Sequence, residues 1–166
     1  MKTTPSNCKT LNILQLDDNE FTSEGLRMLL IEDHYYSRNL GDFFYFEGYK
    51  IDLAKDFIMA DELLKKGKEY HIAIVDLDMD KRDLTPKIRK EAKDLFGGWA
   101  YYKYVLSQHE ILKNNTIILS GFLMEFKKTK EYDTHKHQLT FIDKIDPNVK
   151  EKLSIAIGKL VGQMQN

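Results

Sequence analysis

The sequence predicts an α/β domain built on a doubly wound parallel sheet. Four apolar runs of four to six residues are rich in aliphatic side chains, and each ends at a polar residue. Patterns typical of amphipathic helices lie between these runs. Such an alternation of strands and helices is typical of a parallel sheet covered on both faces, with right-handed crossovers.

The apolar runs are predicted to be strands because short, continuously apolar segments are typical of strands buried on both faces. They cover residues 11–16, 71–75, 116–119 and 139–142. A weaker fifth candidate at 49–54 alternates apolar and polar residues, which indicates an edge strand.

Helical spacing of apolar side chains predicts helices over residues 21–31, 57–66 and 99–112. A C-terminal helix is predicted to begin at Asp146 and Pro147, since a capping Asp followed by Pro in the first turn is a common helix start. Three long connections remain, at 32–48, 80–98 and 122–138. We expect loops of this length to be functional or mobile, and the charged middle one to hold an extra helix.

Length and composition indicate one soluble domain with a net charge close to zero. The chain has 166 residues and a net charge of −1, which argues against a broad electrostatic surface for nucleic acid or an anionic membrane. The single cysteine, Cys8, fits a reducing compartment, and no apolar run is long enough to span a bilayer. We therefore expect a cytoplasmic protein with a flexible leader over residues 1–10, one domain over 11–166 and no second domain after it.

The chemistry is concentrated where the predicted strands end. Because ligands of open parallel sheets bind outside the carboxyl ends of the strands, the residues at these ends are the candidate site. They are Asp17 and Asp18 after the first run, Asp76, Asp78 and Asp80 after the second, Ser120 after the third, and Asp143 and Lys144 after the fourth.

This set of residues suits phosphoryl transfer to a carboxylate. Adjacent carboxylates repel one another unless a cation lies among them, and Mg²⁺ prefers carboxylate oxygens. An Asp carboxylate such as Asp76 can attack phosphorus and form an acyl phosphate. Lys144 would supply positive charge and Ser120 a hydroxyl for the transferred oxygens.

The pattern resembles the receiver domain of bacterial two-component response regulators. The matching segments are LNILQLDDNE, IAIVDLDMD, TIILSG and LTFIDKI, which occur in the family's order. The resemblance extends from Leu11 to Val161. It implies a flavodoxin-like (βα)5 fold whose five parallel strands have the order 2-1-3-4-5.

The resemblance also implies a role for each site residue. Asp76 would be the phosphoacceptor, and it would bind Mg²⁺ together with Asp18 and the backbone carbonyl of Asp78. Asp17 would act on the metal mainly through water. Ser120 and the aromatic Phe141 would be the switch residues that move inward when the protein is phosphorylated.

The implied partners are a histidine kinase or histidine phosphotransfer protein as phosphoryl donor, and an unknown downstream protein. No direct contact with nucleic acid or membrane is expected. The protein would be a single-domain phosphoacceptor that signals by protein–protein interaction, with at most self-phosphorylation and autodephosphorylation activity.

Several readings compete with this one. A phosphatase of the haloacid dehalogenase type also uses an Asp-x-Asp, a hydroxyl, a lysine and Mg²⁺, although in the opposite chain order. A degenerate receiver that only binds partners is the other alternative, since Asp80 and Ile145 replace the family's usual prolines and Phe122 lies close to the phosphoryl position. Taken singly, Phe141 is equally explained as a core residue.

Overall fold

The computed structural model describes residues 9–19 and 46–164. Its five strands form one sheet in the order β2-β1-β3-β4-β5, and every neighbouring pair is parallel. The predicted doubly wound, flavodoxin-like fold with strand order 2-1-3-4-5 is thereby confirmed. The strands are β1 (Lys9–Leu16), β2 (Phe46–Ala54), β3 (Ile72–Val75), β4 (Thr116–Ser120) and β5 (Thr140–Asp143).

The predicted strands agree closely with these bounds. The weakest candidate, at 49–54, is part of β2 and lies at the edge of the sheet, as its alternating pattern indicated. The predicted helix at 21–31, most of the connection at 32–48 and the first eight residues of the predicted leader lie outside the described residues.

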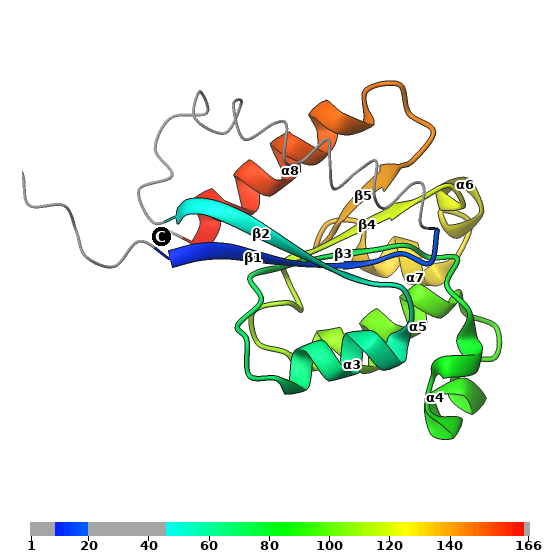
Figure 1. Cartoon of the computed structure of the whole chain (residues 1–166). Coiled ribbons are helices and arrows are strands. Elements are labelled where there is room, and N and C mark those ends of the chain that lie inside the picture. The colour runs from blue at the N-terminus through cyan, green and yellow to red at the C-terminus, as the bar shows by residue number, and fades with distance from the viewer. Residues whose placement is uncertain (1–8, 20–45, 165–166) are drawn as a thin grey trace, which may run out of the picture.

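Helices cover both faces of the sheet. Figure 1 shows α8 (Val149–Met164) on one face, and α3 (Phe57–Lys65) and α5 (Gly97–Tyr104) on the other. Successive strand residues alternate between the two resulting cores, so that Leu14 and Leu16 of β1 face α3 and α5 while Ile13 faces α8. Burial on both faces explains why β3 and β4 are buried at every position.

The helices predicted at 57–66 and after Asp146 are both present, and α3 begins with a side-chain cap. The carboxylate of Asp56 accepts a hydrogen bond from the Met59 amide, 2.7 Å away, at the start of α3. The predicted start of the C-terminal helix at Asp146 and Pro147 was early: α8 begins at Val149, and the Asp146 carboxylate accepts from the Asn148 amide at 2.8 Å in the turn before it. No helix in the described ranges is both long and apolar enough to cross a bilayer.

The helix predicted at 99–112 is shorter than expected. It begins at Gly97 and ends at Tyr104, followed by a 3₁₀ turn, η2 (Leu106–Gln108). The Ser107 hydroxyl donates to the Lys103 carbonyl at 2.6 Å, which is the carbonyl that the Ser107 amide would bond in a continuing helix. Competition of this kind between side chain and backbone favours helix ends.

Two of the three long connections contain short helices. Residues 80–98 hold the 3₁₀ turn η1 (Lys81–Asp83) and α4 (Pro86–Glu91), so the extra helix expected there is present. Residues 122–138 hold α6 (Leu123–Phe126) and α7 (Lys130–His135), and the expectation of a loop there was wrong. Both helices are too short to produce a clear helical repeat in the sequence.

Candidate functional site

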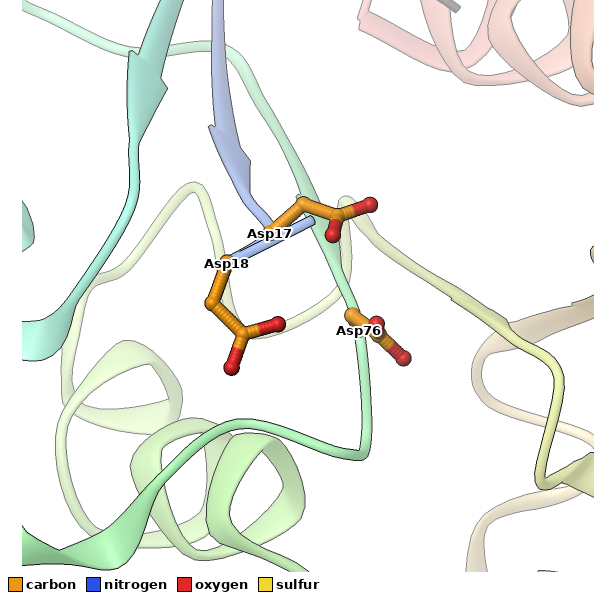
Figure 2. A group of neighbouring side chains, drawn as sticks. All are labelled: Asp17, Asp18 and Asp76. Carbon is orange, nitrogen blue, oxygen red and sulfur yellow. The ribbon is translucent and has the colours of Figure 1, made fainter. Parts of the chain in front are cut away.

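Backbone pairing brings the ends of β1 and β3 side by side. The Asp76 amide donates to the Leu16 carbonyl at 2.9 Å, and the Asp17 amide donates to the Ala54 carbonyl at 3.1 Å. Asp17 and Asp18 therefore end one strand next to Asp76 on the other, as Figure 2 shows. One carboxylate oxygen from each of the three residues lies within 4.8 Å of the others.

A lysine from the end of β5 joins this carboxylate cluster. The Lys144 ammonium donates to Asp17 Oδ2 at 2.7 Å and to Asp76 Oδ2 at 2.8 Å. The exposed fraction of the side chain is 3% for Asp17, 9% for Asp76 and 13% for Lys144. Lys144 thus bridges two buried carboxylates that are 59 residues apart in the chain, because their strands are neighbours.

The remaining carboxylate oxygens are held by the backbone. Asp17 Oδ1 accepts from the Asn19 amide at 2.9 Å, and Asp76 Oδ1 accepts from the Asp78 amide at 3.3 Å. Each buried carboxylate therefore has one oxygen on Lys144 and the other on an amide two residues further along. Two contacts therefore orient each of these side chains.

The cluster carries more negative than positive charge. Three carboxylates face a single ammonium. Partial desolvation by its neighbours raises the pKa of the Asp18 carboxyl, and the negative charges of Asp76 and Asp17 raise it further. Burial alone would lower the pKa of Lys144, but its hydrogen bonds to Asp17 and Asp76 outweigh that effect and leave the pKa raised.

These residues fit a divalent cation. Every donor is a carboxylate oxygen, the class that Mg²⁺ prefers, and the excess negative charge is what a cation would neutralise. Asp18 is the exposed member, so it lies on the side of the cluster that solvent reaches. The side chain of Asp78 is also exposed, and the resemblance assigns only its carbonyl to the metal.

The two switch candidates lie in different surroundings. Ser120 is fully buried, and its hydroxyl accepts from the Phe122 amide at 3.2 Å; among the described residues, no contact joins that hydroxyl to Asp76. Phe141 packs in an aromatic cluster with Tyr132, Phe126 and Trp99, at ring-centre distances of 5.1, 5.8 and 6.3 Å. The structure therefore brings Asp17, Asp18, Asp76 and Lys144 together, with Ser120 and Phe141 on the adjoining strands.

The residues that depart from the pattern of the receiver family lie around the carboxylate cluster rather than within it. Ile145 is 79% exposed, and Phe122 is 44% exposed and contacts Phe96 at 6.2 Å between ring centres. Asp80 caps η1 and pairs with Arg82, so it belongs to the segment 80–96 that precedes α5 (the inserted segment) rather than to the carboxylate cluster.

The glycine pair at the start of α5 was not predicted from the sequence. Gly97 and Gly98 are buried, and the Gly98 amide donates to the Leu77 carbonyl at 3.0 Å, directly after Asp76. Two successive glycines opening a helix were the available signal, since glycine disfavours helices and is used where backbones approach closely.

Comparisons with known proteins point to one fold. No protein-family model and no curated protein matches the sequence. Among solved structures, the chain is similar to a CheY-like response regulator receiver domain protein from Methanospirillum hungatei, with a TM-score of 0.56 and 16% identity over 95% of this chain and 98% of that one. The response regulator receiver domain protein from Clostridium thermocellum gives a TM-score of 0.54 and 18% identity over 93% and 97%.

A third similar structure is the signal receiver domain of a signal transduction histidine kinase from Syntrophus aciditrophicus, with a TM-score of 0.59 and 16% identity over 95% of this chain and 94% of that one. The chain has the receiver-domain fold. The likeness covers nearly the whole of each of these chains. In this chain the carboxylate cluster stands at the carboxyl edge of the sheet. It lies where open α/β sheets bind their ligands.

Proposed function

We propose that this protein is a response regulator receiver that accepts a phosphoryl group on Asp76 in a Mg²⁺-dependent reaction. The observation that carries the proposal is the Lys144 ammonium bridging Asp17 and Asp76 within a cluster of three carboxylates. A purely structural ion pair needs one carboxylate for each lysine. Here the carboxylates outnumber the lysine, and a metal ion would balance their excess negative charge. Asp76 is also oriented by two separate contacts.

The proposed reaction moves one phosphoryl group between two side chains. An oxygen of the Asp76 carboxylate attacks phosphorus of a phosphohistidine on the donor protein. The new O–P bond forms as the P–N bond breaks, and the donor imidazole keeps the electron pair of that bond and takes up a proton. Lys144 is placed to stabilise negative charge on the transferred oxygens as its contact with Asp76 is released.

Asp18, Asp76 and the carbonyl of Asp78 would hold Mg²⁺, with Asp17 acting through water. The bound metal would neutralise charge on the transferred oxygens. Ser120 would bind a phosphoryl oxygen after leaving its contact with Phe122, and Phe141 would report the change to the neighbouring helices. The donor would be a histidine kinase or phosphotransfer protein, and one domain over residues 11–166 would signal in the cytoplasm to a downstream protein.

The test is phosphorylation by a small-molecule donor. Wild type, Asp76→Asn and Asp83→Asn are each incubated with acetyl phosphate and Mg²⁺, and intact mass is recorded. Asp83 is the matched control because it lies in the exposed turn η1, away from the cluster. We expect one phosphoryl adduct on wild type and Asp83→Asn, none on Asp76→Asn, and none on any of the three when a chelator removes Mg²⁺.

Other results favour the other readings. A wild type that gains no adduct from any donor would support a domain that only binds partners. Repeated release of phosphate from simple esters, abolished in Asp78→Asn, would support a phosphatase, since Asp78 would then be the acid/base of an Asp-x-Asp pair.

A further inference from the structure

The start of α5 lies directly against the backbone of the segment 76–79. A Cβ built on Gly98 would stand 1.8 Å from the Asp76 carbonyl oxygen, and one built on Gly97 would stand 1.9 Å from the Met79 carbonyl oxygen. Real Cβ atoms essentially never approach other heavy atoms within 3.0 Å. Only glycine at these two positions allows α5 and this segment to lie in contact.

The glycine pair engages most of the segment's carbonyls. Gly98 faces the carbonyl of Asp76 and donates its amide to that of Leu77, while Gly97 faces that of Met79. The side chains of Leu77 and Met79 are buried on the core side. Among the described residues, none donates a hydrogen bond to the carbonyl of Asp78, the one that the proposed function assigns to Mg²⁺.

The same contact separates the site from the inserted segment. The chain leaves the segment 76–79 at Asp80 and returns to it at Gly97, after η1 and α4. Because Gly97 lies against Met79, the two ends of the segment 80–96 lie close together, next to the carboxylate cluster. The segment between them packs on the core through Leu84 and Ala92, while α5 contacts the backbone of Asp76 through Gly98.

We propose that Gly97 and Gly98 are positioning residues for the Asp76 site, which they hold in register with Asp17, Asp18 and Lys144. The inference rests on the proposed function and deepens it. The Asp76 carbonyl and carboxylate share one Cα, so a side chain at position 98 that displaces the carbonyl also displaces the carboxylate. Displacements of about 1 Å can cost about a hundredfold in rate when a reaction depends on alignment.

The experiment compares Gly98→Ala with Gly162→Ala. Gly162 lies exposed on α8, and a Cβ there meets nothing within 4 Å, which makes it the matched control. Both variants are studied at a temperature where circular dichroism shows them folded. We expect Gly98→Ala to weaken Mg²⁺ binding, measured by calorimetry, about tenfold or more, and to slow phosphorylation by acetyl phosphate at saturating Mg²⁺ about a hundredfold. Gly162→Ala should match wild type in both.

A second measurement applies even if Gly98→Ala does not fold. The amide resonance of Gly98 in the wild-type protein is followed by NMR during a Mg²⁺ titration, with that of Gly162 as reference. We expect the Gly98 resonance to shift with the same apparent affinity that calorimetry gives, and the Gly162 resonance to stay in place.

The inference is overturned if folded Gly98→Ala binds Mg²⁺ and accepts the phosphoryl group as wild type does, even at a lower melting temperature, since the glycine would then serve packing alone. It is equally overturned if the Gly98 resonance does not respond to Mg²⁺ in a wild type that binds the metal. A wild type that neither binds Mg²⁺ nor gains an adduct overturns the proposed function as well, so the two failures are distinguishable.

Discussion

Two lysine–carboxylate clusters in this protein are built from the same groups but differ in charge balance. At the carboxyl edge of the sheet, Lys144 faces Asp17, Asp76 and the nearby Asp18. Between α5 and α7, Lys103 donates to Glu131 Oε1 at 2.7 Å, and the indole of Trp99 donates to Glu131 Oε2 at 2.9 Å. Both oxygens of this second carboxylate are satisfied by one cation and one neutral donor.

The difference separates a structural fastening from a binding site. The Glu131 cluster is complete in itself, and its contacts join two helices that are distant in the sequence. The Lys144 cluster has surplus negative charge in a largely buried position, which is unfavourable without a further cation. Dependence on a divalent cation should therefore distinguish the two clusters.

The largest effect is expected for Lys144→Met. Removing the ammonium leaves Asp17 and Asp76 as buried, uncompensated neighbours, and breaking a buried pair on one side costs about 3–5 kcal/mol. We expect a loss of this size in the free energy of unfolding when a chelator is present. Mg²⁺ should restore part of it, so the stabilisation by Mg²⁺ should exceed that of wild type in urea titrations.

Lys103→Met is the matched control for this prediction. The Lys103 side chain is 38% exposed and Glu131 keeps the Trp99 hydrogen bond, so the loss should be smaller and the same with or without Mg²⁺. The comparison fails if Lys103→Met responds to Mg²⁺ more than wild type does, or if Lys144→Met responds no more than wild type.

An intermediate effect is expected for Glu131→Gln. Burial tends to raise the pKa of Glu131, but hydrogen bonds from Lys103 and Trp99 outweigh it and hold the pKa below its ordinary value. A lowered folded-state pKa contributes stability that is complete above the ordinary value of 4.5 and lost as the pH falls through the folded-state pKa. We expect Glu131→Gln to cost about 1–2 kcal/mol at neutral pH and nothing in strong acid.

The control is Glu125→Gln on α6, an exposed acid outside this cluster. Urea titrations of both variants and wild type across the acid range give the measurement. A constant difference between Glu131→Gln and wild type at all pH values would show that the carboxylate charge contributes nothing, and the cluster would lose its description as a balanced ion pair.

The sequence was sufficient for the sheet and for the members of the carboxylate cluster. Runs of apolar residues buried on both faces can be recognised in the sequence, and Asp17 and Asp76 directly follow two of them. Lys144 directly follows β5, whose apolar run ends two residues earlier. The carboxyl ends of parallel strands meet at one edge of the sheet, so the residues that follow different strands are neighbours in space. That is why residues 127 positions apart, Asp17 and Lys144, could be grouped correctly.

The second cluster had no such signal. Trp99 and Glu131 are 32 residues apart on two helices, one of which, α7, is too short to be recognised from its periodicity. Their contact depends on how α5 and α7 pack, and the sequence pattern does not specify that packing. The contact of Gly98 with Asp76 is similar, because it depends on a close approach of two backbones rather than on any side-chain pattern.

The smallest effect, and the sharpest on the comparison, is expected for Asp18→Asn. Asp18 is the exposed carboxylate of the three, and partial desolvation and then its acidic neighbours raise its pKa, so its charge is repelled in the absence of a cation. Removing that charge should raise the free energy of unfolding slightly in the presence of a chelator, by less than about 1 kcal/mol. In Mg²⁺ the sign should reverse, because the variant loses a metal ligand and gains less from the ion. Asp94→Asn, an exposed acid in the inserted segment, should show neither change. A sign that stays the same in chelator and Mg²⁺ would mean that Asp18 does not bind the metal, and the site would have to be rebuilt on Asp17 and Asp76 alone.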